Sequence, residues 1–416
     1  MLPLKNMDFD LNNLSIFNQF FVKRPEITSD QLKLDLEKYY LPYAQKLIAL
    51  KQQQSPNQGL IVGVSAIQGA GKTTQGEIME ILLGSLGHST NSLSIDDHYI
   101  THRQLCELRR IDPRFIRRGV THDIALAMRD LKKLQTMEAG KPILISGYDK
   151  GIQSGDGDRL RWINPIPKLT IRLKVEAKEL MVNKQLQQVK ALELISASLS
   201  DQDLILLDNM GSDLPVLDYF LPQALIEFLN AQSGEVTVTA DDSGTVLFVG
   251  QGEINVEKSE LPSGWRVVNK KPDFIFYDGW MLGARSVADG SVFASGLPAL
   301  ETPEAQQFAK DVNKKLLDYE KLWAIFGFLN LLYVINYDDS LKWRDQAEEA
   351  LRQKGEGMSK EQIVEFVHYF WRSVHPAIHI KNLAHDNEHT NQVIIINDDH
   401  SVGEILSPAE AKQKYP

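Results

Sequence analysis

Residues 66–74 read AIQGAGKTT and follow directly on an apolar run, LIVGVSA. Glycines in such a loop let backbone N–H groups surround an anion, and the following helix adds the positive end of its dipole. Lys72 is placed to reach the β- and γ-phosphates of a nucleotide, and Thr73 offers a hydroxyl to Mg²⁺. The strict G-x-x-x-x-G-K-[ST] pattern would have glycine where this sequence has Ala66. Strand, glycines, Lys-Thr and helix nevertheless occur in the required order, which predicts an ATP or GTP site.

Two further features bear on what this site does with the nucleotide. A GTP-specific site would carry Asn-Lys-x-Asp, and the nearest string, NKKPD at 269–273, has the wrong spacing. A hydrolytic ATPase would carry an apolar strand that ends in Asp-Glu. Here FIFYDG ends in Asp278-Gly279, with no adjacent carboxylate to activate water. These features favour phosphoryl transfer to a bound small molecule over hydrolysis.

Acidic residues follow two of the predicted strands. SLSI runs into Asp96 and Asp97, and FIFY runs into Asp278. Ligands of open α/β sheets bind at the carboxyl ends of strands, so Asp96 could accept the proton of an attacking hydroxyl and Asp278 could assist Mg²⁺. The alternative for Asp97 is a cap on a helix that begins near Thr101, and for Asp278 a turn or helix cap.

Basic and aromatic residues form a second group of candidates. Tyr148 and Lys150 follow the apolar run at 142–146, and GIQSGDGDR leads on to Arg159. These side chains could bind an anionic substrate or the transferred phosphate, or could form a solvated loop. His122 precedes a helix at 123–135 and is either a substrate hydrogen-bonding group or a buried structural histidine.

Two patterns in the last third of the chain also have alternatives. Arg344 lies on a charged helical segment, 341–355, and could reach the phosphates from a closing lid, although most such arginines are only solvated. His385 and His389 have the spacing of two metal ligands on a helix, but HDNEHTN is rich in turn formers and favours a polar surface loop.

The composition is that of an ordinary globular protein. The chain has 416 residues, 43% of them hydrophobic, and a formal net charge of −10. This acidic balance argues against general nucleic-acid binding. A single cysteine, Cys106, excludes an internal disulfide and suggests a reducing compartment. Neither a signal peptide nor a membrane-spanning run is evident, so we expect a cytoplasmic protein without a membrane partner. The sequence does not predict an oligomeric state.

Short apolar runs typical of buried parallel strands alternate with helical patterns. The runs lie at 60–66, 92–95, 142–146, 274–277, 331–336 and 393–396. Thr302 before Pro303 predicts the start of a helix that reaches about Trp323, and Ser359 with Gln362 predicts a capping box for another. This alternation predicts an α/β fold with a mostly parallel central sheet covered by helices on both faces.

The expected organisation has four parts. Residues 1–58 form a helical lead-in interrupted at Pro42, and residues 59–163 and 270–416 form the core. Residues 164–269 do not continue this alternation of strands and helices. They contain an amphipathic stretch at about 174–198 and a helical segment near 215–231. The string EVTVTADDSGTVLFVG alternates apolar and polar residues, which predicts a β-hairpin. We interpret this block as an inserted α+β subdomain.

With these strings in place, the sequence resembles the D-glycerate 3-kinases of plant and fungal type. These enzymes are related to the uridine kinase, phosphoribulokinase and pantothenate kinase group. The similar stretches, in the family's order, are YYLPYAQKL (39–47), VGVSAIQGAGKTTQ (62–75), SIDDHY (94–99), YDKGIQSGDGDR (148–159), FIFYDGWMLG (274–283), LKWRDQAE (341–348), GMSKEQIVEFV (357–367) and VIIINDDHSV (393–402). They are spread over about 310 residues outside 164–269. The resemblance implies the three-layer fold of P-loop NTPases.

The resemblance also implies an activity: ATP- and Mg²⁺-dependent phosphorylation of D-glycerate to 3-phosphoglycerate. By position, ATP would be bound by the loop residues Gly69, Ala70, Gly71, Lys72, Thr73 and Thr74. Mg²⁺ would be held by Thr73 and Asp278, although Asp278 stands where we expect glutamate. The catalytic residues would be Lys72, Asp96, Arg159 and Arg344. The acceptor would lie near Asp97, Tyr99, His122, Tyr148 and Lys150. The alternatives are a kinase for another hydroxylated metabolite, such as a nucleoside, pantothenate or a sugar acid, and an ATP-binding regulatory protein without turnover.

Overall fold

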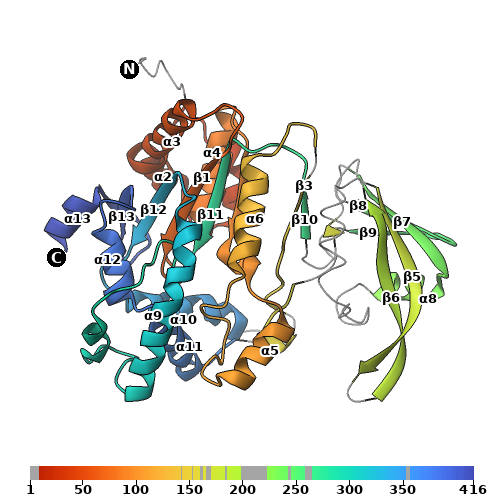
Figure 1. Ribbon diagram of the computed structural model, residues 1–416. Coiled ribbons are helices and arrows are strands. Elements are labelled where there is room, and N and C mark those ends of the chain that lie inside the picture. The colour runs from red at the N-terminus through yellow and green to blue at the C-terminus, as the bar shows by residue number, and fades with distance from the viewer. Residues whose placement is uncertain are drawn as a thin grey trace. The chain divides into compact units, whose positions relative to one another are not determined.

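A computed structural model describes residues 9–141, 143–151, 153–159, 163–164, 170–182, 185–197, 223–241, 245–257, 265–352 and 357–416. The chain divides into two compact units (Figure 1). The first contains Met1–Asp96, Glu107–Met137 and Pro272–Pro416, and the second contains Asp97–Cys106 and Glu138–Lys271. The second unit is thus larger than the insertion expected at 164–269, because it also takes in the loop that carries Tyr148 and Arg159.

The first unit is built on a six-stranded sheet in the order β14-β13-β12-β1-β11-β2. Its strands are β1 (Leu60–Ala66), β2 (Thr90–Ser94), β11 (Phe274–Gly279), β12 (Phe328–Tyr333), β13 (Gln392–Ile396) and β14 (Val402–Leu406). All neighbouring pairs are parallel except β13 with β14. The predicted α/β fold with a mostly parallel sheet is confirmed, and β14 is a strand that the apolar pattern did not indicate.

Apolar composition explains why β1 occupies the middle of the sheet. All seven of its residues are buried, so both faces of the strand must be covered. One face packs against α4 (Lys72–Ser85), whose Ile78 and Leu82 belong to the same hydrophobic cluster as Val62. On the other face, a Cβ atom at Gly63 would lie 2.7 Å from the ring of Phe326, so only glycine fits there. The sheet is therefore the middle layer of three (Figure 1).

Four of the remaining helices of the first unit lie where the sequence predicts them, whereas the two short helices after residue 380 were not predicted. They include α6 (Ile124–Gln135), α9 (Pro303–Trp323), α10 (Asp339–Arg352), α11 (Lys360–Ser373), α12 (Lys381–Ala384) and α13 (Pro408–Lys414). Thr302 caps α9, and Ser359 with Gln362 forms the capping box of α11, as predicted. Asp123 caps α6 through the N–H of Leu126. The capping side chains therefore mark the starts of these three helices in the sequence.

The N-terminal segment is helical, as expected. It contains α1 (Asn18–Lys23), α2 (Ser29–Asp35), a π-helical turn (Leu36–Tyr40) and α3 (Leu41–Gln53). Pro42 lies in the first turn of α3, directly after the π-helical turn, so the expected interruption is a local change of helix type and not a break. The Tyr39 hydroxyl accepts hydrogen bonds from Gln75 of α4 and, at 3.0 Å, from Asn330 of β12. This buried network joins the segment to the helix that follows the phosphate loop.

The second unit contains two further sheets. One has the order β3-β10-β4, from β3 (Ile143–Ile145), β10 (Trp265–Val268) and β4 (Ile163–Asn164), and the other the order β6-β5-β7-β8-β9. The apolar run at 142–146 was expected in the parallel sheet. That expectation is wrong, because β3 pairs antiparallel with β10.

The five-stranded sheet contains β5 (Ile171–Val182), β6 (Gln185–Ala197), β7 (Gly234–Ala240), β8 (Thr245–Val249) and β9 (Glu253–Glu257). The amphipathic stretch at about 174–198 is thus an antiparallel pair of long strands, β5 with β6. The predicted hairpin is confirmed as β7 with β8, and the predicted helical segment as α8 (Gln223–Ala231), while 198–222 lies outside the described residues.

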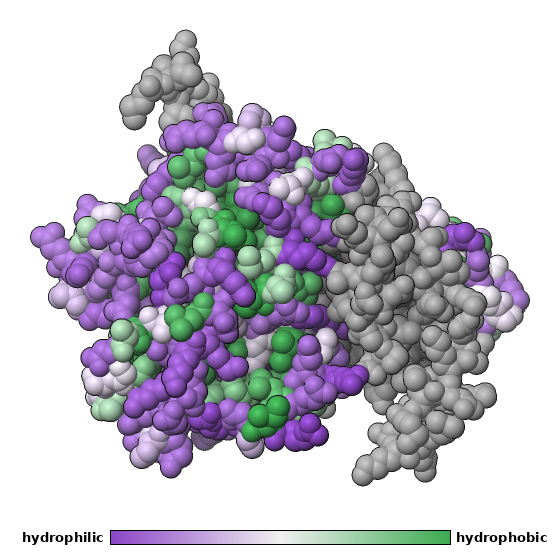
Figure 2. Space-filling view, in the orientation of Figure 1, coloured by the Kyte–Doolittle hydropathy of each residue, from purple (hydrophilic) through white to green (hydrophobic). Residues whose placement is uncertain are grey.

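Figure 2 shows that polar side chains cover most of the described surface on the face with α6, α9 and α10, and that hydrophobic ones are exposed in small separate groups. Among the described residues, every helix falls short of the length and apolar character needed to cross a lipid bilayer.

Candidate active site

The phosphate loop connects β1 to α4 in the geometry that anion binding requires. Gly69 and Gly71 have φ values of 84° and 86°, which side-chain-bearing residues rarely adopt. Gly71 is also the N-cap of α4, and it caps none of the first N–H groups with a side chain. Those groups can therefore point at an anion. The Lys72 Nζ donates to the carbonyls of Ala66 at 2.8 Å and Ile67 at 3.0 Å, which holds the ammonium over the loop.

Helix α10 is packed directly on this loop. A Cβ atom at Gly69 would lie only 2.7 Å from the Cβ atom of Trp343, so the glycine allows the helix to approach. The Trp343 Nε1 donates to the Asp398 carbonyl at 3.1 Å, and its ring centroid lies 4.4 Å from that of His400. No motif in the sequence assigns Trp343 or His400 to the site, because their partners come from distant parts of the chain.

Asp96 and Asp278 follow neighbouring strands at the same edge of the sheet. Asp278 is in register with Ser94 of β2 and Val64 of β1, and Asp96 lies in the 3-10 helix Ile95–His98 that continues β2. Parallel strands bring their carboxyl ends to one edge, which is also the edge where the phosphate loop leaves β1. The structure therefore places both predicted acids at the loop's edge of the sheet.

Glycine after Asp278 is required by close packing. A Cβ atom at Gly279 would lie 2.1 Å from Leu282 Cδ1 and 2.6 Å from Ile95 Cγ2. The chain after β11 therefore passes directly beside the 3-10 helix that carries Asp96. Asp278 itself is half-buried at the end of β11.

His122 faces Asp96 inside the first unit. Its Nε2 lies 4.0 Å from Asp96 Oδ1, and its imidazole is fully buried whereas the Asp96 side chain is 23% exposed. On the other side, its Nδ1 lies 2.9 Å from the Tyr319 hydroxyl, and the oxygen of that hydroxyl accepts a hydrogen bond from the His122 backbone N–H at 3.2 Å. Burial raises the pKa of Tyr319 far above its usual range, so the phenol stays protonated. Tyr319 thus joins the candidate site through its contact with His122, and no motif in the sequence marks it.

The predicted substrate loop belongs to the second unit and is held by its own side chains. The Tyr148 hydroxyl donates to the Asp156 carbonyl at 3.0 Å, and Arg159 Nε donates to the Tyr99 carbonyl at 2.7 Å. The rings of Tyr99 and Tyr148 lie 5.5 Å apart. The structure thus brings Tyr99, Tyr148 and Arg159 together, whereas Lys150 is exposed.

One acidic residue organises this loop further. Asp158 Oδ1 accepts from the backbone N–H groups of His102 at 2.9 Å and Arg159 at 2.8 Å. Asp97 lies 3.6 Å from Arg266, so it takes part in an ion pair of the second unit. Asp97 is not the cap of α5 (His102–Ile111), which begins five positions later.

The Arg344 side chain interacts with residues of its own helix and of the next one. It pairs with Glu348 one turn later on α10, and its guanidinium lies 4.9 Å from the centre of the Phe366 ring on α11. The side chain is therefore anchored between two helices, and its predicted lid role stays a prediction. His389 pairs with Asp386 at 2.8 Å, and within the described ranges no three His, Cys, Asp or Glu side chains form a metal-binding group.

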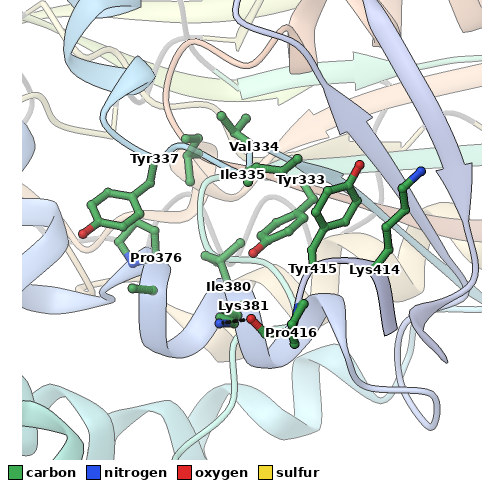
Figure 3. A pocket seen from close by; sticks show the side chains of 12 residues that line it. Tyr333, Val334, Ile335, Tyr337, Pro376, Ile380, Lys381, Lys414, Tyr415 and Pro416 are labelled. Atoms are coloured by element: carbon green, nitrogen blue, oxygen red, sulfur yellow. Dashed lines mark hydrogen bonds between the residues drawn. The ribbon is translucent and has the colours of Figure 1, made fainter. Parts of the chain in front are cut away.

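Two cavities border the phosphate loop. One, of about 410 Å³, touches Ile67 and the end of β12 and is lined mainly by apolar side chains (Figure 3). Both of its lysines are engaged, because Lys381 donates to the Pro416 carbonyl at 2.6 Å and Lys414 pairs with Glu404. The other, of about 500 Å³, is lined by Gly69, Ala70, Gly71 and Thr74 of the loop itself.

The sequence of the chain is similar to parts of two known proteins. No family model matches the chain. Over 179 residues it is 27% identical to a protein named as an uncharacterized kinase, mug58, of Schizosaccharomyces pombe, covering 42% of this chain and 62% of that protein. Over 140 residues it is 29% identical to the chloroplastic D-glycerate 3-kinase of Arabidopsis thaliana, covering 30% and 31%. The chain spans less than two thirds of the length of either relative.

Comparison of structures extends the likeness to almost the whole fold. A D-glycerate 3-kinase from Cryptococcus neoformans var. grubii superposes with a TM-score of 0.54 at 15% identity, over 88% of this chain and 98% of the other. A structure titled YGR205w protein gives 0.52 at 18% identity, over 88% and 96%. The fold and the loop define a three-layer α/β protein of the P-loop class. Within that class, the resemblance to D-glycerate 3-kinase is confirmed.

Proposed function

We propose that this chain is an ATP-dependent kinase that phosphorylates a hydroxyl group of a small molecule, with D-glycerate as the acceptor and 3-phosphoglycerate as the product. The observation that carries the proposal is the shared sheet edge. The phosphate loop leaves β1 there, and Asp278 and Asp96 follow the next two strands. A phosphate cradle beside two strand-end carboxylates is what phosphoryl transfer to an alcohol needs. The names of the relatives support the choice of acceptor.

The chemistry divides among the residues of the first unit. Lys72 and the N–H groups of the loop bind the phosphates and neutralise their charge. Asp96 accepts the proton of the acceptor hydroxyl as that oxygen attacks the terminal phosphorus. His122 lies next to the Asp96 carboxylate: a protonated Tyr319 that donates to Nδ1 would leave the imidazole proton on Nε2, on the side of Asp96 Oδ1, which is 4.0 Å away and so in charge contact without a hydrogen bond. His122 is a positioning residue in this account.

Mg²⁺ fits the oxygen donors available at this edge. Thr73 lies in the first turn of α4, and Asp278 ends β11 with a half-buried carboxylate. Magnesium sites of this kind use one or two protein oxygens together with substrate phosphates, so a larger acidic cluster is not needed. When bound, the ion would neutralise charge that develops on the phosphate oxygens. Lys150, Arg159 and Arg344 complete the proposal as groups for the acceptor and the moving phosphoryl group.

The test is a coupled assay of ADP release by the purified chain. ATP and Mg²⁺ are supplied with one acceptor at a time: D-glycerate, a nucleoside, pantothenate or a pentose phosphate. We expect turnover with D-glycerate and little with the others. Preference for another acceptor would support the proposed kinase activity but replace D-glycerate as the proposed substrate. ATP binding without turnover on any acceptor would overturn the proposal in favour of a regulatory nucleotide-binding protein.

A further inference from the structure

The cavity of about 500 Å³ beside the loop is lined mostly by residues of the first unit that lie outside the phosphate loop. One end is formed by Gly69, Gly71 and Thr74. The wall opposite is formed by the N-terminal segment between Glu26 and Tyr40. The ends of β12 and β13 and the turn before β14 complete it, through Leu332, Ile396, Asp399, His400, Ser401 and Val402.

The order of the strands fixes which end of a nucleotide would occupy this cavity. The sheet runs β14-β13-β12-β1-β11-β2, so the cavity lies on the β12 side of β1. Asp278 and Asp96 lie on the opposite side, after β11 and β2. A nucleotide with its phosphates in the loop and its terminal phosphate toward Asp96 must extend its nucleoside toward β12 and β13.

The lining suits a flat heterocycle rather than a phosphate. Buried apolar side chains form much of the wall, among them Tyr40, Ile78, Leu332 and Ile396. The described lining residues include three carboxylates and no lysine or arginine. His400 adds no positive charge at neutral pH, because burial lowers the pKa of its imidazole. Carboxylates repel phosphate but accept hydrogen bonds from amino groups.

Asp35 is the lining carboxylate of the N-terminal segment that the structure holds in place, whereas Asp399 already accepts two hydrogen bonds from Ser401. Asp35 is the last residue of α2, and its Oδ1 accepts from Gln31 Nε2 at 3.0 Å. Lys38, three positions later, donates to the Val402 carbonyl at 2.9 Å, which joins the helical segment to the start of β14. Asp35 is half-buried, and desolvation raises the pKa of its carboxyl. A carboxylate positioned in this way can select for a donor on the ligand.

We propose that this cavity is the nucleoside site, that residues 26–40 form its outer wall, and that the Asp35 carboxylate accepts a hydrogen bond from the exocyclic amino group of adenine. The inference rests on the proposed kinase function for the direction of the nucleotide. It gives the N-terminal helical segment a role in nucleotide choice.

The experiment compares ATP with ITP, in which a carbonyl replaces that amino group. For the unaltered chain we expect kcat/KM to favour ATP about tenfold, the size of one hydrogen bond to a charged group. In Asp35→Asn, the kcat/KM values for ATP and ITP should differ by no more than about twofold, because the asparagine amide can donate to the carbonyl of ITP. The matched control is Asp30→Asn, an exposed acid on the same helix that does not line the cavity, and it should keep the tenfold preference. A general loss of stability would lower both rates and leave their ratio unchanged.

Calorimetric titration with ADP and IDP separates this inference from the proposed function, since it requires no acceptor. Preferential ADP binding that Asp35→Asn removes would support the nucleoside site even if no acceptor were phosphorylated. Phosphotransfer with the same ATP:ITP ratio in the unaltered chain and in Asp35→Asn would overturn the inference and leave the kinase intact.

Discussion

The strand edge of the first unit and the Tyr148–Arg159 loop of the second hold their polar side chains in different ways. At the edge, Asp278 lies in the largely buried strand β11 and Asp96 in the 3-10 helix that continues β2, so the backbone of the sheet sets the positions of both acids. In the loop, Tyr148 and Arg159 make hydrogen bonds that fold the loop itself. The backbone thus sets the positions of the acids at the edge, whereas in the loop the side chains that could serve the site also fold the loop. The predictions below test this contrast.

The largest effect is expected at the phosphate loop. Lys72→Ala removes the ammonium held over the loop by Ala66 and Ile67, and we expect kcat/KM for ATP to fall about a thousandfold. Steady-state kinetics in the ADP-release assay measure it. Lys314→Ala, on an exposed position of α9, is the control and should be unchanged. Equal rates for Lys72→Ala and the control would show that the loop does not bind phosphates.

A smaller effect is expected at Asp278. Asp278→Ala should lower kcat/KM about a hundredfold and shift half-saturation by Mg²⁺ to higher concentration, because an oxygen near the ion is lost. Asp278→Glu should restore most of the activity. EDTA should abolish turnover in all three proteins. A Mg²⁺ titration that is the same for Asp278→Ala and the unaltered chain would exclude Asp278 from metal binding.

In the loop of the second unit, the exposed Lys150 is the side chain to test. Lys150→Ala should raise KM for D-glycerate about tenfold and leave KM for ATP unchanged, as expected for loss of one cation near an anionic acceptor. Lys141→Ala, an exposed lysine of the same unit paired with Glu138, is the matched control. An altered KM for ATP with an unaltered KM for D-glycerate would contradict this assignment.

The smallest effect on catalysis is expected for His379, a buried histidine in the C-terminal part of the chain, whose substitution should change stability instead. Burial lowers the pKa of His379 to about 4, below the ordinary value of about 6.5. Between these values the unfolded chain binds a proton that the folded chain does not, so stability falls as pH is lowered from about 6.5 to 4. His379→Gln should flatten this dependence by about 1.4 kcal/mol per pH unit. Urea unfolding at several pH values measures the slope, and an unchanged slope would rule out His379 as its source.

Much of the first unit could be predicted because its signals are local. β1 is a continuous apolar run, and Thr302, Ser359 and Asp123 cap helices through bonds to neighbours three residues away. β3 has the same apolar composition but belongs to a different sheet, since composition does not specify a strand's partner. β14 has a mixed burial pattern and so lacked a clear signal.

The predicted site was incomplete for a related reason. Tyr319 reaches His122 across 197 residues of sequence, and Trp343 reaches Gly69 through the packing of α10. Neither contact leaves a motif, because each depends on how α9 or α10 lies against the sheet. Residues 26–40 line a cavity, although their sequence pattern predicts only a helical lead-in. Motifs therefore predict the residues at strand ends, and tertiary packing decides what surrounds them.

The central claim is tested most directly by single-turnover phosphoryl transfer from ATP to D-glycerate with Asp96→Asn beside the unaltered chain. The substitution keeps the shape of the side chain and removes its ability to accept a proton. We predict a rate lower by about two to four orders of magnitude, with the Kd for ATP unchanged. A rate equal to that of the unaltered chain would contradict the claim that the acid at the end of β2 is the catalytic base.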